Sequence, residues 1–120
     1  MLTAKQVAAT AAKALEDKMG LDIRAIEITD VSTLADYFLI CTATSNTHVR
    51  TLCDAVDEVL DVAGEKLLNR EGHRSGTWVL MDYGCVVVHV FTEETRALDA
   101  LERLWQDGRE VDVKTLTDEA

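Results

Sequence analysis

Hydrophobic residues recur along this chain with two different spacings, and each spacing predicts one type of element. A spacing of three and four positions is typical of an amphipathic helix, and it occupies residues 4–18, 44–63 and 92–108, caps included. Thr3 and Gln6 form a capping-box sequence in front of the first of these segments. We therefore expect three helices, each with one buried face.

Shorter apolar segments between the helices predict strands. The segment 36–43 is apolar at most positions, which is typical of a central strand covered on both faces. The segment 21–29 changes its apolar phase between Ile23 and Ile26, so either a bulge or a late start of the strand is expected there. Two later segments flank a tight turn at Tyr83–Gly84 and predict a hairpin. The predicted strands are residues 21–29, 36–43, 66–69, 77–82 and 85–91, with loops at 30–35 and 70–76.

The order of these elements predicts an α/β fold in a single domain. A helix lies between the second and third strands, and such a crossover implies at least one parallel pair, so the sheet is expected to be mixed. We expect about five strands flanked by three helices. The domain is assigned to residues 1–108, and residues 109–120 are assigned to a polar C-terminal tail that forms either an edge strand or a loose end.

The composition favours a folded chain and disfavours a nucleic-acid-binding one. Hydrophobic residues occupy 48% of the 120 positions, which is ample for a buried core. The 22 acidic residues outnumber the 12 basic residues and give a formal net charge of −10. Because nucleic-acid affinity comes largely from Lys and Arg, we expect no direct binding to DNA and little to RNA. A partner that contains nucleic acid is expected to be contacted through its protein.

The cysteines and the N-terminal segment indicate a cytoplasmic protein. The chain has three cysteines, Cys41, Cys53 and Cys85, and no two of them are close together in the sequence. An odd number of widely spaced cysteines is typical of reduced thiols. The N-terminal segment contains charged residues such as Lys5 and Lys13, so it matches neither a secretory leader nor a membrane span. No association with a membrane is expected.

The candidate catalytic and metal-binding residues do not form a recognisable pattern. Cys85 and His89 suggest a nucleophile and a base, but four strand positions separate them by about 13 Å, at roughly 3.3 Å per residue. His48, His73 and His89 have no metal-ligand spacing. The six glycines are scattered and form no phosphate-binding loop. We therefore predict no catalytic residue, no metal and no cofactor.

The hairpin carries the most distinctive surface. Strand alternation places Trp78, Leu80 and Asp82 on one face, and Val79 and Met81 on the other. A tryptophan in a row that ends in a carboxylate is typical of an interface. The alternative is that Trp78 packs under the last helix as a core residue.

Three segments of the chain resemble the ribosomal silencing factor family, which is also called Iojap-like. The segments are residues 30–58, 71–91 and 96–105, and together they span most of the domain. The strings that carry the resemblance are ADYF, TS, EG, W-x-L-x-DYG, VVVHVF and LERLW. Their combination and order are specific, whereas each string alone is not.

The resemblance implies both a fold and a function. The fold would be α/β and similar to that of nucleotidyltransferases, but without their catalytic pattern, so an enzyme is not expected. The protein would bind large-subunit ribosomal protein fourteen at the intersubunit face of the large ribosomal subunit. It would then block association of the subunits and repress translation under nutrient limitation. Members of this family often form homodimers, so the resemblance also implies a second copy of the chain as a partner.

The resemblance also implies which residues bind the ribosomal partner. These residues are Trp78, Leu80, Asp82 and Tyr83 of the hairpin, Glu71 and Gly72 before it, and Asp36 and Tyr37 as support. The chain departs from the family pattern at Cys85, where an acidic residue is usual, and at Leu98 and Asp99, where an aromatic pair is usual. Two other functions stay open at this point, a divergent nucleotidyltransferase and a homodimerisation module.

Overall fold

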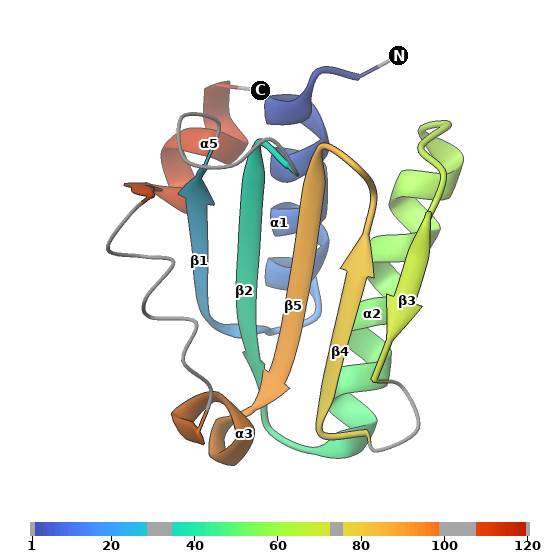
Figure 1. Cartoon of the computed structure of the whole chain (residues 1–120), viewed down its shortest axis with the longest axis vertical. Helices are drawn as coiled ribbons and strands as arrows, with labels where there is room; N and C mark the ends of the chain where they lie inside the picture. The colour runs from blue at the N-terminus through green and yellow to red at the C-terminus, as the bar shows by residue number, and fades with distance from the viewer. Residues whose placement is uncertain (1, 29–34, 73–75, 99–107, 120) are drawn as a thin grey trace.

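The computed structural model describes residues 2–28, 35–72, 76–98 and 108–119, and it forms one sheet flanked by helices (Figure 1). In chain order, the described elements are α1 (Ala4–Asp17), β1 (Leu21–Glu27), β2 (Tyr37–Ala43), α2 (Asn46–Val62), β3 (Asn69–Glu71), β4 (Trp78–Asp82), β5 (Val86–Thr92), α3 (Glu93–Leu98), β6 (Arg109–Val111) and α5 (Val113–Glu119).

The sheet is mixed, as the sequence predicts. Its six strands lie in the order β3-β4-β5-β2-β1-β6, which is one strand more than the five expected. The central strands β2 and β5 are parallel, with Tyr37 opposite Val86 and Ala43 opposite Thr92. The other neighbouring strands are antiparallel. The α/β prediction with a crossover helix between β2 and β3 is therefore confirmed.

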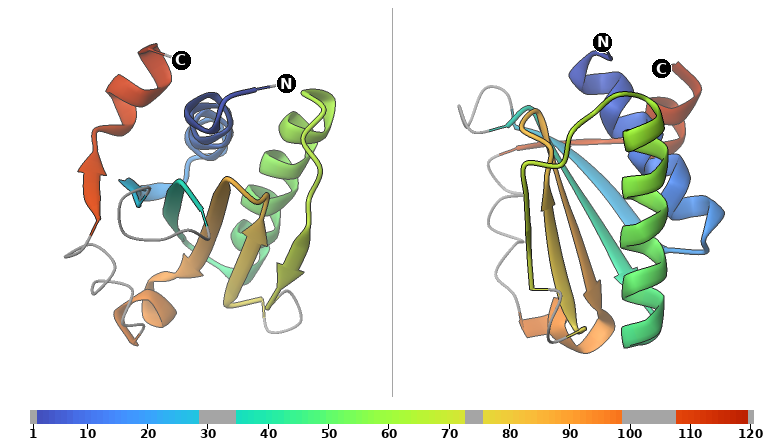
Figure 2. Two further views of the ribbon diagram at one scale, coloured as in Figure 1. Left: turned by 45° about the horizontal axis from the view of Figure 1, so that its top comes forward. Right: turned by 90° about the vertical axis from the view of Figure 1, so that its right-hand side faces the viewer.

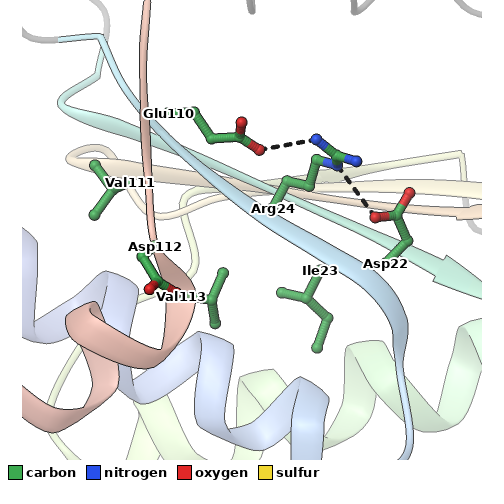
Figure 3. A pocket seen from close by; sticks show the side chains of 7 residues that line it. All are labelled: Asp22, Ile23, Arg24, Glu110, Val111, Asp112 and Val113. Carbon is green, nitrogen blue, oxygen red and sulfur yellow. Dashed lines mark hydrogen bonds and ion pairs between the residues drawn. The ribbon is translucent and has the colours of Figure 1, made fainter.

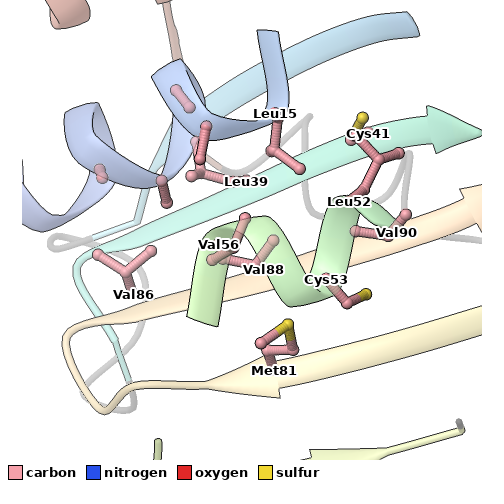
Figure 4. Close-up of a cluster of buried hydrophobic side chains, with 14 of the residues drawn as sticks. Leu15, Leu39, Cys41, Leu52, Cys53, Val56, Met81, Val86, Val88 and Val90 are labelled. Carbon is pink, nitrogen blue, oxygen red and sulfur yellow. The ribbon is translucent and has the colours of Figure 1, made fainter. Parts of the chain in front are cut away.

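Helices α1 and α2 cover the same face of the sheet, and α5 packs beside α1 (Figure 2). The larger part of the core lies between these helices and the sheet (Figure 4). A smaller cluster lies on the opposite face, where Trp78, Phe38 and Val87 pack against buried Ile40 and Phe91. The two faces of the sheet are therefore both apolar, but they are covered differently.

Local sequence explains where the first two helices begin and end. Thr3 and Gln6 form the predicted capping box, in which each side chain accepts a hydrogen bond from the backbone N–H of the other. Ser45 caps α2, because its hydroxyl accepts a hydrogen bond from the backbone N–H of His48. Gly64 follows α2 with a φ of +88°, which a glycine adopts without strain.

Several predicted boundaries shift in the structure. The bulge in β1 lies between Leu21 and Arg24, slightly earlier than expected. Strand β3 occupies 69–71, whereas the sequence predicts 66–69, and the hairpin turn centres on Gly84 and Cys85, one position later than predicted. The predicted last helix is described from Glu93 to Leu98, and its expected apolar residues Leu101, Leu104 and Trp105 lie outside the described residues.

The C-terminal segment packs onto the sheet and α1. Strand β6 pairs with β1 at the edge of the sheet, which is one of the two alternatives that the sequence leaves open. Helix α5 is not predicted, and it brings the fully buried Leu116 against the main core. With α5, the structure describes four helices where three are expected. No described helix is long and apolar enough to cross a bilayer.

Candidate docking surface

Strand β4 presents two different rows of side chains, as its sequence predicts. Val79 and Met81 are buried on the face that α1 and α2 cover. Trp78, Leu80 and Asp82 lie on the opposite face and are each partly exposed. The alternation therefore gives one strand both a core row and a surface row.

The neighbouring strand β3 extends the surface row. Its register places Glu71 beside Leu80 and Asn69 beside Asp82, and both β3 residues are exposed. We name the five residues Trp78, Leu80, Asp82, Asn69 and Glu71 the β3–β4 surface. Asn69 is absent from the residues predicted to bind, because neither the family resemblance nor the alternation of β4 indicates it. The alternation of β3 against β4 becomes visible only once their register is known.

Trp78 is held in place by its neighbours without being fully buried. Its indole ring stacks on Phe91, with 6.4 Å between ring centroids and 24° between the planes. A Cβ added at Gly72 would lie 2.4 Å from Cε3 of the indole, and Gly72 has a φ of +84°, so the position requires glycine. The indole N–H has no hydrogen-bond partner among the described residues. Trp78 therefore packs against the smaller cluster and is also partly exposed.

Asp82 has a structural role at the end of the same row. Its carboxylate accepts a hydrogen bond of 2.8 Å from the backbone N–H of Gly84, and its carbonyl accepts one of 2.8 Å from Leu68. These contacts fix the hairpin turn and the start of β3. Asp82 is also partly exposed, so it belongs to the surface row as well as to the turn.

Tyr83 does not belong to this surface. It is only 5% exposed and lies in the main core, which its predicted position in a hairpin turn does not indicate. The phenol donates a hydrogen bond of 2.9 Å to Asp57 on α2. Burial raises the pKa of Tyr83 far above its usual value, and the nearby Asp57 carboxylate raises it further.

Asp36 and Tyr37 connect the hairpin to β1 and β2. Tyr37 is buried in the main core, and its hydroxyl donates a hydrogen bond of 3.1 Å to the Glu27 carboxylate. Burial raises the pKa of Tyr37, and the hydrogen bond to Glu27 adds to the increase. The backbone N–H of Asp36 donates to the carbonyl of Cys85 at 2.8 Å. Both residues therefore support the hairpin and lie outside the β3–β4 surface.

The opposite edge of the sheet carries a hollow of about 380 Å³ between β1 and β6 (Figure 3). Its rim is charged, and its apolar wall includes Ile23, Val111 and Val113. Arg24 of β1 forms an ion pair of 3.1 Å with Asp22 of the same strand and one of 2.9 Å with Glu110 of β6. Because these charges are paired with one another, the arrangement fastens β6 to β1.

A second hollow, of about 590 Å³, lies where the parallel strands β2 and β5 end. It is lined by hydroxyl and amide side chains that include Thr44, Ser45 and Asn46, together with Glu93 and Glu94. Within the described ranges, no group of three or more His, Cys, Asp or Glu side chains is placed to hold a metal ion.

Comparison with known proteins identifies the family to which this chain is similar. The profile of the family described as "Ribosomal silencing factor during starvation" matches residues 1–120. The chain is 38% identical to Ribosomal silencing factor RsfS of Bacillus subtilis over 104 residues, which cover 87% of this chain and 88% of the relative. A crystal structure of a Chromobacterium violaceum protein superposes with a TM-score of 0.84 at 35% identity, covering 88% of each chain. A Bacillus halodurans structure gives a TM-score of 0.76 at 34% identity, covering 86% of this chain and 93% of that one.

Proposed function

Because the chain belongs to the ribosomal silencing factor family, we propose that it binds the large ribosomal subunit and prevents the small subunit from joining. The proposed contact is large-subunit ribosomal protein fourteen, and the expected result is repression of translation under nutrient limitation. The protein would act by occupying space and not by catalysis. The observation that carries this proposal is the partly exposed aromatic and acidic row on β4, which faces away from α1 and α2.

The β3–β4 surface has the chemistry of a protein-binding surface. Trp78 and Leu80 supply apolar area, and interface residues that lose most affinity when truncated are often tryptophans in such a setting. Glu71 and Asp82 flank this area with negative charge, which suits the basic proteins of a ribosome. The stacked Trp78 ring is already held in place before binding, so little side-chain entropy would be lost.

The net charge favours a protein partner over ribosomal RNA. A chain with a net charge of −10 is repelled by a phosphate backbone at long range. The RNA around a ribosomal protein would repel the chain. The contact should therefore be confined to the surface of that one protein. The homodimer implied by the resemblance stays a prediction.

The direct test is sedimentation of the purified protein with isolated large subunits. Leu80→Glu places a charge in the centre of the β3–β4 surface, and its matched control is Val62→Glu, at an 85% exposed position on α2. We expect Leu80→Glu to lose about 2 kcal/mol or more of binding free energy, a decrease in affinity of roughly thirtyfold. Val62→Glu should bind like the wild type.

Two results would contradict the proposal. Equal binding of both variants, with both folded, would exclude the β3–β4 surface as the docking site. Tight binding of the wild type to protein-free ribosomal RNA at physiological salt would contradict the choice of a protein partner. The functional readout is the yield of complete ribosomes from separated subunits, which the wild type should lower and Leu80→Glu should leave unchanged.

A further inference from the structure

We infer that His48 is held as a neutral imidazole with its proton on Nε2, and that it serves as a pH-sensitive clip between the end of α1 and the start of α2. The clip consists of three residues, Lys18, Thr44 and His48. Lys18 is the residue that ends α1, and Thr44 precedes the Ser45 cap of α2. The clip therefore joins positions that are far apart in the sequence, and it lies outside the proposed docking surface.

The two backbone partners of the ring determine where its proton lies. The backbone N–H of Thr44 donates to Nδ1 at 2.9 Å, so this nitrogen must offer a lone pair. The carbonyl of Lys18 lies 2.9 Å from Nε2 and can only accept, so this nitrogen must carry the proton. Because neither partner can exchange its role, the geometry selects one neutral tautomer.

The hydroxyl of Thr44 is compatible with this assignment. Its Oγ1 lies 3.2 Å from the same Nδ1, and a hydroxyl can donate to the lone pair of the neutral ring. The backbone N–H of His48 itself donates to the Ser45 hydroxyl at 3.1 Å. The ring and the helix cap therefore form one hydrogen-bonded unit at the start of α2.

The clip holds a segment that has unfavourable backbone geometry. Met19 directly follows Lys18 and has a φ of +63°, which is uncommon for a residue with a side chain. Gly20 comes next, where an added Cβ would lie 2.5 Å from Sγ of Cys41. The hydrogen bond from His48 to the carbonyl of Lys18 fixes the backbone directly before Met19 and Gly20.

A second proton on the ring would open one side of the clip. It would be added to Nδ1, where it would face the N–H of Thr44 and the positive end of α2. The bond between Nε2 and Lys18 would survive, because that nitrogen is already a donor. Acidification should therefore detach the Thr44 turn from the ring while α1 stays attached.

Charged side chains around the clip are of both signs and are all exposed. They are Asp17 and Lys18 at the end of α1, Arg50 on α2, and Glu93 and Glu94 across the neighbouring hollow. Water and salt screen such exposed charges, whereas the two facing N–H groups would be in direct contact. The donor–donor conflict at Nδ1 should therefore dominate the pH response.

The state of the clip also affects the second hollow. Thr44, Ser45 and Asn46 form part of its wall, so release of Thr44 would change the shape of a hollow of about 590 Å³. This effect would be local, because Thr44, Ser45 and Asn46 are not part of the main hydrophobic core.

The tautomer is tested by long-range ¹H–¹⁵N correlation spectra of the histidine rings in the intact protein. At about pH 7.5 we expect the His48 pattern of a neutral ring protonated at Nε2. On lowering the pH, the Thr44 amide should lose hydrogen-exchange protection in step with ring protonation. A ring protonated at Nδ1, or a charged ring at about pH 7.5, would overturn the inference.

A thermal melting series with His48→Gln gives an independent test. His89 and His73 are present in both proteins, so their contribution to the pH dependence cancels. Between about pH 7.5 and 5.5 we expect the Tm of the wild type to fall by roughly 4 °C more than the Tm of His48→Gln. Parallel pH profiles of the two proteins would refute the clip. The spectra of the wild type decide the question even when the variant does not fold.

Discussion

The two edges of the sheet are built in opposite ways. At one edge, β6 is joined to β1 by the ion pairs of Arg24 with Glu110 and of Arg109 with Glu27, and α5 continues from it onto α1. At the other edge, β3 is the outermost strand, and its neighbour β4 carries the partly exposed Trp78 and Leu80. At the first edge, contacts within the chain fasten β6, and next to the second edge lies the surface that we assign to a partner.

The difference separates residues that stabilise the fold from residues that bind. An uncovered edge strand is a template for association, and proteins usually protect such strands by covering them or by placing charges on them. The chain covers the β1 edge with its own C-terminal segment. At the β3 edge it retains a short strand with Glu71 beside the apolar row. Variants at the two edges should therefore affect different measurements.

The largest effect is expected for Leu116→Ala at the covered edge. Leu116 is fully buried against the main core, so truncation should lower the free energy of unfolding by about 2–5 kcal/mol. Binding to large subunits should be unchanged at temperatures where the variant is folded. Chemical denaturation measures the loss, and Thr115→Ala, at an exposed position of α5, is the control. A loss equal to that of the control would mean that α5 contributes nothing to global stability.

A smaller effect is expected for Tyr83→Phe, which lies next to the docking row but inside the core. The change removes the hydrogen bond to Asp57 and should cost about 1 kcal/mol of stability without weakening subunit binding. If the variant keeps its stability but binds large subunits less tightly, Tyr83 is part of the docking surface. The separation between docking residues and core residues would then be contradicted at this position.

The same variant has a predicted pH signature. Burial raises the pKa of Tyr83, and it raises the pKa of Cys53 to about 12, so both groups keep their protons in the folded state longer than in the unfolded chain. Stability is then fully present below the unfolded pKa values and decreases as the pH rises beyond about 9. Tyr83→Phe should flatten the decrease above roughly pH 10, as measured by denaturation at fixed pH.

The smallest effect is expected for Arg24→Gln. Its ion pairs are largely exposed, so their loss should cost about 1 kcal/mol or less. The cost should shrink further at high salt, because exposed pairs are screened. Lys66→Gln, at an exposed position before β3, provides the comparison. A cost that is large and independent of salt would show that the β1 edge is held by more than surface charge.

The sequence predicts the elements that contain their own signals. The capping box of α1 and the alternation of β4 each depend on residues close together in the chain. The crossover rule predicts a parallel pair from the element order, but it does not identify that pair as β2 and β5. The alternation also places Trp78, Leu80 and Asp82 on one face correctly.

The remaining features depend on distant partners. Strand β6 and helix α5 are too short for a hydrophobic period, and Leu116 is buried only because α1 presents a small-residue surface to it. Tyr83 looks like an exposed turn residue until Asp57 on α2 is found beside it. The requirement for glycine at position 72 appears only when the indole of Trp78 is in place.

The parallel pair at the centre of the sheet also determines when folding can finish. Strand β2 pairs with β5, whose first residue is made about fifty positions later in synthesis. Until then, the segment that contains α1, β1, β2 and α2 lacks the strand that completes its core. Contacts between distant segments slow folding, because the chain between them must be ordered first. A growing chain of this protein should therefore stay incompletely packed until β5 has been synthesised, and the β6 edge should close last.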